Sequence, residues 1–188
     1  MELLDSAIKF AVDAHSGMTR KRSNTPYIVH PMEAAVIVST MTSNDEVIAA
    51  AVLHDVVEDT PATIDDIRRR FGDRVAKLVA SETEDKRSDR PASETWRERK
   101  EESLSFLAST DDLDVKRVWL GDKLSNMRSY YRLYLKEGPN LWRNFHQTDP
   151  LQQEWYYRRI ADLLSDLSDT EAWQEYSFLV DLVFERNA

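Results

Sequence analysis

The chain has no cysteine among its 188 residues, and only four glycines and six prolines. Without cysteine it can form neither disulfide bonds nor thiolate metal sites, so a bound metal ion would need ligands from histidine, aspartate or glutamate. The scarcity of glycine and proline, together with 41% hydrophobic and 31% charged residues, is typical of a compact helical protein. We therefore predict an all-α fold in one domain, residues 1–188.

Long apolar segments are also absent. No stretch reaches the roughly 18 apolar residues that a membrane helix requires, and residues 1–5 lack the basic start and apolar core of an export signal. A net charge of −9 and a pI near 5.0 give no overall basic field that would attract nucleic acid or an anionic membrane surface. These absences predict a soluble, cytoplasmic protein whose main partner is neither nucleic acid nor a membrane.

Apolar residues recur at helical spacing along most of the chain, which predicts about eight to ten helices. In the first half of the chain, the predicted helices cover residues 2–15, a segment that begins at Pro31, a segment that begins with a capping box at Ser43 and ends at Thr60, and residues 63–72, with a continuation at 75–79. In the second half they cover residues 95–109, 114–136, 140–146, 151–167 and 170–186. The segment 82–93 is charged and contains proline, so we expect a mobile loop with solvated carboxylates.

A polar group stands where a buried helix should stay apolar. The run Val47–Leu53 leads directly into His54-Asp55, and Glu58-Asp59 follow about one helical turn later. Burying an imidazole and several carboxylates costs free energy unless they are paired or bind a cation. An exposed helix end with ordinary charges is the alternative, because a His-Asp pair alone is common.

Three other segments favour a site over a solvated helix end. His30, beside Pro31, offers a second imidazole; Asp122 lies within an apolar helix with Asn126 one turn later; residues 20–22 concentrate positive charge. Two histidines and two aspartates form a mixed nitrogen and oxygen set that suits Mn²⁺, Fe²⁺ or Zn²⁺. A basic loop beside such a site indicates a phosphate-bearing substrate. His15 is expected to form hydrogen bonds that support this loop, and not to bind metal.

Taken in order, these motifs resemble a known family. The segments 14–21, 26–31, 51–60, 71–72 and 121–128 are similar to the HD-type hydrolase domain of RelA/SpoT alarmone enzymes, and most similar to stand-alone small alarmone hydrolases, including the metazoan form. The resemblance covers roughly residues 7–130 and implies an HD-domain helical bundle with no synthetase domain after it. The helices over 140–186 lie beyond it.

The resemblance implies roles for individual residues. Four residues match the family's ligands for one Mn²⁺ ion: His30, His54, Asp55 and Asp122. Glu58 and Asp59 match its catalytic acidic pair. The implied reaction removes the 3′-pyrophosphate of ppGpp or pppGpp and yields GDP or GTP.

The resemblance also implies contacts to this nucleotide substrate. Arg20 and Lys21 match a basic substrate loop, and Asn126 matches a residue at the nucleotide end of the pocket. Tyr156 is placed near the nucleotide sugar, with Trp155 and Tyr157 as alternative registers.

Alternatives remain open at this stage. Other HD proteins hydrolyse nucleoside monophosphates, and a pocket for a 2′- or 3′-phosphate on adenosine would accept NADPH or an adenosine alarmone. A nucleotide-binding regulator or antitoxin is a hypothesis from another class, although the presence of every metal and acidic position favours turnover. The aromatic residues of the C-terminal third favour core packing, with a dimer face as the alternative.

Overall fold

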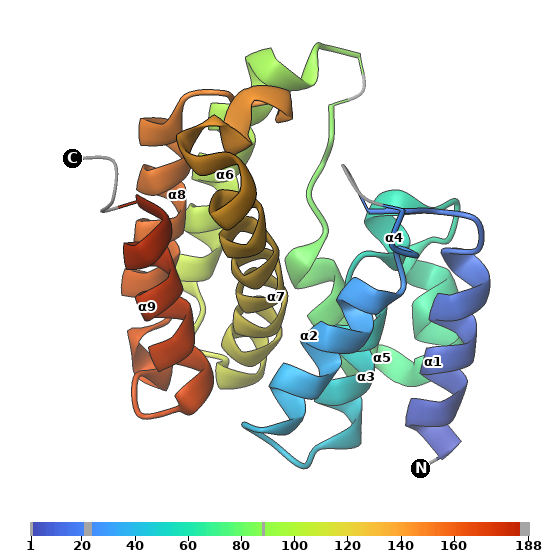
Figure 1. The fold of residues 1–188 in the computed structure, drawn as a ribbon. Coiled ribbons are helices and arrows are strands. Elements are labelled where there is room, and N and C mark those ends of the chain that lie inside the picture. Colours follow the sequence, from blue (N-terminus) through green and yellow to red (C-terminus); the bar gives the residue numbers. More distant parts are fainter. Residues whose placement is uncertain (1, 21–23, 88, 185–188) are drawn as a thin grey trace. The chain divides into compact units, whose positions relative to one another are not determined.

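The computed structural model describes residues 2–20, 24–87 and 89–184, apart from the side chain of Asn144. Within these residues the regular elements are nine α-helices and two 3₁₀-helices, accompanied by an isolated bridge between Thr19 and Pro26 (Figure 1). The prediction of an all-α fold is therefore confirmed. Among the described helices, none combines the length and the apolar character needed to cross a membrane.

The chain forms two compact units. The first contains Met1–Thr83 and Asp112–Ser125, and the second contains Glu84–Asp111 and Asn126–Ala188. Helix α7, Leu113–Glu137, begins in the first unit and continues in the second. That the whole chain is one domain stays a prediction.

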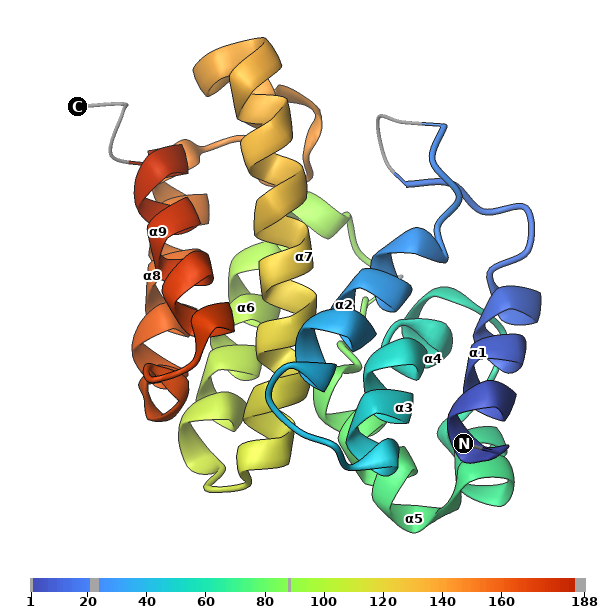
Figure 2. The same ribbon diagram turned by 60° about the horizontal axis from the view of Figure 1, so that its bottom comes forward.

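The first unit is built around helix α3. Its helices are α1 Glu2–Ala14, α2 Val29–Ser39, α3 Asp45–Leu53, α4 Val56–Asp59 and α5 Ile64–Glu82, followed by the start of α7. Helix α3 packs against α1, α2 and α5 and lies between α1 and α2 in Figure 2. Its residues from Ala49 to Leu53 are buried, so the apolar run seen in the sequence is the centre of this unit.

The start of α3 differs from the prediction. Asn44, and not Ser43, caps this helix: its side-chain oxygen accepts a hydrogen bond of 3.0 Å from the backbone N–H of Glu46. Asparagine is among the strongest capping residues, since its short side chain reaches the free donors of the first turn. The predicted capping box at Ser43 was wrong by one residue.

The helical backbone is interrupted at residues 54–55, which was not predicted, and at Gly72, which was. Residues 54–55 form a turn between α3 and α4, whereas the sequence predicted one helix through to Thr60. Helix α5 begins next to Thr63, as expected, and Thr63 caps it in a reciprocal capping box with Asp66. Gly72 then interrupts the helical backbone with φ of +89°, a conformation in which other residues are strained.

The second unit packs its aromatic residues internally. Its further elements are α6 Ala92–Ser109, the 3₁₀-helix η1 Gly138–Asn144, α8 Pro150–Leu163, η2 Ser165–Leu167 and α9 Glu171–Phe184. Helices α8 and α9 lie side by side (Figures 1 and 2). Trp142 stacks on Phe184 with ring centroids 5.6 Å apart, and Tyr130 meets Trp142 edge-on at 5.2 Å. Core packing of these aromatics is confirmed.

Glu84 corrects the prediction of solvated carboxylates in the segment 82–93. Its side chain is only 11% exposed and pairs with Arg99, while Lys100 donates a hydrogen bond of 3.0 Å to its other oxygen. A buried carboxylate needs such partners because it has lost its hydration. In the first unit the Glu82 side chain is also buried, at 2% exposed.

Gly121 allows α7 to approach α2 closely within the first unit. A Cβ atom at this position would lie 2.7 Å from Cγ2 of Val38 and 2.9 Å from the backbone oxygen of Ala34. Both separations are shorter than atoms at such contacts tolerate, and the second involves backbone that cannot rotate away. The close approach places the next residue, Asp122, beside the elements that carry His30 and His54.

We expect Gly121→Ala to destabilise the protein by about 1–3 kcal/mol, the usual cost of inserting a methyl group into a tightly packed site. This expectation opposes helix propensity, which alone would make alanine more stable by about 1 kcal/mol. Urea unfolding measures the difference. The double variant Gly121→Ala with Val38→Ala should recover only part of the loss, because the clash with the Ala34 backbone remains; a single variant as stable as the wild type would contradict the close approach.

Candidate metal centre

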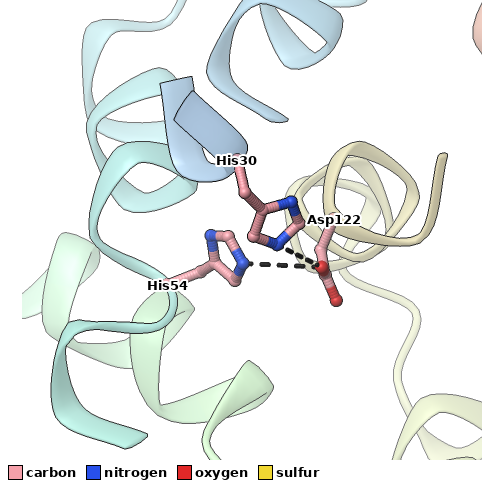
Figure 3. Close-up of side chains that lie close together, drawn as sticks. All are labelled: His30, His54 and Asp122. Carbon is pink, nitrogen blue, oxygen red and sulfur yellow. Dashed lines mark ion pairs between the residues drawn. The ribbon is translucent and has the colours of Figure 1, made fainter. Parts of the chain in front are cut away.

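Two imidazoles and two carboxylates converge inside the first unit. Nε2 of His30 lies 3.0 Å from Oδ1 of Asp122 and 3.4 Å from Oδ2 of Asp55. Nε2 of His54 lies 3.2 Å from the same Asp55 oxygen and 3.5 Å from the same Asp122 oxygen. Figure 3 shows both rings directing a nitrogen at one oxygen of Asp122. Four donor atoms thus surround one point.

The four donors come from two helices and one turn. His30 is the second residue of α2, and not a residue before the helix as the sequence suggested; Pro31 fits here because donors in the first helical turn have no intrahelical partner. His54 and Asp55 occupy the turn between α3 and α4, and Asp122 lies on α7. His54 and Asp55 keep right-handed helical backbone angles in this turn, and both side chains reach the same point.

The group is almost completely withdrawn from solvent. His30, His54 and Asp122 are 4%, 2% and 5% exposed, and the side chain of Asp55 is 16% exposed. A buried cluster of this composition, with ligand atoms of His30, His54 and Asp122 within 4.8 Å of one another, is of a kind that holds a metal ion.

The hydrogen bonds of the two imidazoles fix their tautomers. Nδ1 of His54 lies 2.8 Å from the backbone oxygen of Ala51, which only accepts, so Nδ1 carries the proton. Nδ1 of His30 lies 2.8 Å from Oγ of Ser125, and that hydroxyl donates its single proton to Glu33 at 2.7 Å. Nδ1 of His30 must therefore donate as well, and the neutral form of each ring presents a lone pair at Nε2.

These lone pairs test whether a cation suits the site. Both point at carboxylate oxygens, which is repulsive unless a proton or a metal ion lies between them. Nε2 of His54 makes no hydrogen bond within the described part of the chain, although it is buried. Ligands about 2.1 Å from one ion lie about 3.0 Å apart in octahedral and about 3.4 Å apart in tetrahedral geometry. The observed separations of 3.0–3.5 Å agree with both.

Without a metal ion, protons take part in balancing the charge. Burial lowers the pKa of His30. Burial also opposes charge on His54, but the nearby Asp55 and Asp122 outweigh this effect and raise its pKa well above the ordinary value. Burial disfavours the Asp122 carboxylate too, yet Lys123 and the two histidines hold its pKa well below the usual range. The carboxylates thus stay charged at neutral pH, as metal ligands must.

Tyr27 connects the cluster to the predicted acidic pair. Its hydroxyl lies 2.7 Å from Oδ2 of Asp55 and 2.6 Å from Oδ2 of Asp59. Glu58, the neighbour of Asp59 in α4, is half-buried. Burial and the two carboxylates raise the pKa of Tyr27, so the phenol stays protonated as a donor. Asp59 is thereby held one side chain away from Asp55.

His15 does not form the hydrogen bonds that the sequence suggested. Its ring packs on Tyr27 with centroids 4.8 Å apart, and neither ring nitrogen has a hydrogen-bond partner in the described residues. Burial lowers the pKa of this imidazole. It supports Tyr27 by ring packing.

The predicted substrate residues are placed less completely. The guanidinium carbon of Arg20 lies 5.5 Å from the centroid of the Tyr27 ring, whereas Lys21 lies outside the described residues. Asn126 is the first residue of the second unit along α7. Tyr156, also in the second unit, is 3% exposed and packs edge-on against Trp96 at 5.9 Å. Their substrate contacts stay predictions.

Four residues around the cluster were not identified from the sequence. Tyr27 and Ser125 make hydrogen bonds to residues of the cluster, Glu33 accepts one from Ser125, and Glu82 reaches Lys123, whose ammonium also pairs with Asp122. Glu33 lies one helical turn after His30, and Ser125 lies near Asp122, so spacing carried a weak signal for both. Glu82 belongs to an acidic stretch whose carboxylates were expected to be solvated.

Glu82 gives a prediction about pH and stability. Burial raises the pKa of its carboxyl from the ordinary 4.5 to about 8, with Lys123 acting in the opposite direction. The folded protein therefore holds a proton that the unfolded chain releases above pH 4.5, and stability is lost as pH rises towards 8. Glu82→Gln removes this loss.

We expect the unfolding free energy of Glu82→Gln, relative to the wild type, to increase between pH 5 and pH 8 by a few kcal/mol, since one pKa unit corresponds to about 1.4 kcal/mol. Urea unfolding in chelator at both pH values measures it. Glu94→Gln, at an exposed position of α6, is the control and should show no such change. A pH-independent difference for Glu82→Gln would mean that Glu82 is ionised in the folded protein.

Comparison with known proteins places these features in a family. A model of the HD domain family matches residues 7–147. The chain is 40% identical over 127 residues to the bifunctional (p)ppGpp synthase/hydrolase SpoT of Escherichia coli K12, which is 67% of this chain and 18% of that protein. It is 34% identical over 130 residues to guanosine-3′,5′-bis(diphosphate) 3′-pyrophosphohydrolase of Aquifex aeolicus, again spanning 18% of that protein. The chain thus spans under a fifth of the length of these relatives.

Two solved structures extend the similarity. The Listeria monocytogenes EGD-e protein lmo0812 is 34% identical, with a TM-score of 0.72 covering 83% of this chain and 99% of that one. A metazoan ortholog of SpoT, reported to hydrolyse ppGpp, is 26% identical, with a TM-score of 0.75 covering 100% of this chain and 97% of that one. The resemblance found in the sequence is confirmed by these matches. With a family model matching residues 7–147 and a buried His-His-Asp group inside them, the chain belongs to the HD domain family.

Proposed function

We propose that this chain is a Mn²⁺-dependent phosphohydrolase that removes the 3′-pyrophosphate of guanosine alarmones, converting ppGpp to GDP and pppGpp to GTP. The convergence of two Nε2 lone pairs and two carboxylate oxygens on one point carries the proposal. The substrate class is supported by the relatives named for ppGpp hydrolysis. The donor set, with hard oxygen and borderline nitrogen ligands, suits Mn²⁺.

In the proposed reaction, water attacks the phosphorus joined to the 3′ oxygen, and the bond between that phosphorus and the 3′ oxygen breaks. When bound, Mn²⁺ supplies a Lewis acid that polarises a phosphoryl oxygen and lowers the pKa of water. His30, His54, Asp55 and Asp122 would hold it. The remaining work is proton transfer and charge neutralisation by the chain's own side chains.

Glu58 and Asp59 are the proposed groups for proton transfer. One proton must leave the attacking water and one must reach the 3′ oxygen, so a pair of carboxyl groups beside the metal ligands can serve both needs. The Tyr27 hydroxyl lies within hydrogen-bond distance of both Asp55 and Asp59, its single proton serving one carboxylate at a time, and so links the two. Arg20 and Lys21 are the proposed partners of the substrate phosphates.

Product analysis tests the proposal directly. The purified protein, loaded with Mn²⁺, is incubated with ppGpp, and the products are separated by anion-exchange chromatography. NADPH, an adenosine alarmone and a deoxynucleoside monophosphate serve as parallel substrates. Formation of GDP and pyrophosphate supports the proposal. Turnover of another nucleotide alone would move the function to that substrate, and binding without turnover would favour a regulator or antitoxin.

Metal binding and turnover should separate between two groups of variants. We expect Asp55→Ala and Asp122→Ala to lose bound Mn²⁺ and activity together, because each removes a ligand. Glu58→Gln and Asp59→Asn should keep Mn²⁺ and lose about 100-fold or more in kcat, the usual contribution of general acid–base catalysis. Metal analysis and steady-state kinetics give both values. Wild-type turnover in the ligand variants would refute the assigned site.

The basic loop should act on substrate affinity. We expect Arg20→Ala to raise KM for ppGpp about 10-fold or more, since a hydrogen bond to a charged group contributes about 1.5–3 kcal/mol, with bound Mn²⁺ unchanged. Lys21→Ala should behave in the same way. Arg69→Ala, on an exposed part of α5, is the matched control. An unchanged KM in both loop variants would remove the loop from the substrate site.

A further inference from the structure

We infer that Glu33 and Ser125 act as a relay that holds His30 in the tautomer a metal ion requires, and that they are positioning residues for the proposed metal centre. The inference rests on the proposed function, because it concerns the same ion. It goes beyond that function by assigning a role to two side chains that neither bind the ion nor carry out the proposed proton transfers.

The relay is defined by two short hydrogen bonds in the first unit. Oγ of Ser125 is 2.8 Å from Nδ1 of His30 and 2.7 Å from Oε2 of Glu33. Ser125 is completely buried, at 0% exposed, and Glu33 is half-buried. Glu33 and His30 lie one turn apart on α2, whereas Ser125 belongs to α7. The relay therefore joins the two helices at the level of the site.

The direction of each hydrogen bond follows from counting protons. A hydroxyl has one proton, and an ionised carboxylate only accepts. The Ser125 proton therefore points to Glu33, and the lone pairs of Oγ accept from Nδ1–H of His30. Without the carboxylate, Ser125 is free to turn its proton towards Nδ1. The His30 proton would then move to Nε2, the atom that faces Asp122 at 3.0 Å, and this tautomer has no lone pair for a metal ion.

His54 provides the comparison within the same site. Its Nδ1 donates to the backbone oxygen of Ala51 at 2.8 Å. A carbonyl cannot donate, so the helix itself enforces the tautomer of His54. The tautomer of His30 depends instead on side chains and can be altered by substitution.

The Glu33 carboxylate also affects how strongly Nε2 of His30 would bind a metal ion. A hydrogen bond that ends on a negative charge withdraws the Nδ1 proton from the ring and makes Nε2 a better electron donor. Outer partners of this kind typically change metal affinity about 10- to 100-fold when removed. Glu33, a half-buried residue of α2, therefore affects the metal affinity of the proposed centre without being a ligand itself.

Ser125→Ala and Glu33→Met test the relay. Ser125→Ala removes the acceptor for Nδ1–H, and Glu33→Met keeps the length of the side chain while removing the charge. Isothermal titration calorimetry with Mn²⁺ measures the dissociation constant of each variant. We expect it to rise about 10- to 100-fold in both. Dissociation constants within twofold of the wild type in both variants would overturn the inference.

Two controls and a second measurement separate the relay from general damage. Ser81→Ala removes a hydroxyl that donates only locally, to the backbone of Leu78, and Glu46→Met replaces a half-buried glutamate in the first turn of α3; both should bind Mn²⁺ as the wild type does. Imidazole ¹⁵N spectra of the metal-free proteins should show His30 protonated at Nδ1 in the wild type and a shift towards Nε2 in Glu33→Met, with His54 unchanged. An unshifted His30 signal would overturn the inference even if affinity fell.

The wild-type titration distinguishes failure of the inference from failure of the proposed function. If the wild-type protein binds no Mn²⁺, the proposed function fails and the inference falls with it. If the wild type binds Mn²⁺ and both relay variants bind it equally well, only the inference fails.

Discussion

Two imidazole lone pairs and two carboxylate oxygens directed at one buried point make up the constraint on which the first unit depends. Such a group is repulsive unless positive charge lies in its midst. The surrounding side chains are arranged accordingly: Lys123 pairs with one carboxylate, Tyr27 donates to the other, and both Nδ1 atoms have acceptors. The two Nε2 atoms face the carboxylate oxygens at the point between the four donor atoms.

This constraint explains features of the fold that apolar packing alone does not require. Helix α3 ends at Leu53 and turns at the ligand residues, and α7 is drawn against α2 at a glycine. The small residues of α3 let neighbouring helices approach closely while the polar group remains at one end.

The sequence allowed good prediction of elements whose causes are local. Apolar spacing located α1, α5, α6 and α7 to within a few residues. Prediction failed where tertiary contacts decide the outcome. The turn after α3 costs a helical hydrogen bond that only the assembled cluster can offset, and the burial of Glu82 depends on Lys123, far along the chain. The cap at Asn44 competes with an equally plausible neighbour, which local rules cannot separate.

The site residues divide along the same line. His30, His54, Asp55 and Asp122 were first grouped because polar groups stood beside or within apolar segments, and the resemblance then assigned all four to one ion. Spacing alone relates only the adjacent pair. Ser125 and Glu33 could not be identified in this way, because their role exists only once α2 and α7 lie against each other. Their assignment required the direction of each hydrogen bond, which is a property of the folded molecule.

The placement of the four donors also changes what a stability measurement on this protein means. They stand at positions 30, 54, 55 and 122, on two helices and the turn between two others, so an ion held between them would close long loops of the chain. Binding to the folded state alone stabilises it in proportion to the logarithm of the free ion concentration. The midpoint temperature of thermal unfolding would then depend on the free metal concentration in the buffer as well as on the sequence. A substitution that releases the ion would look like a packing defect unless free metal were held constant.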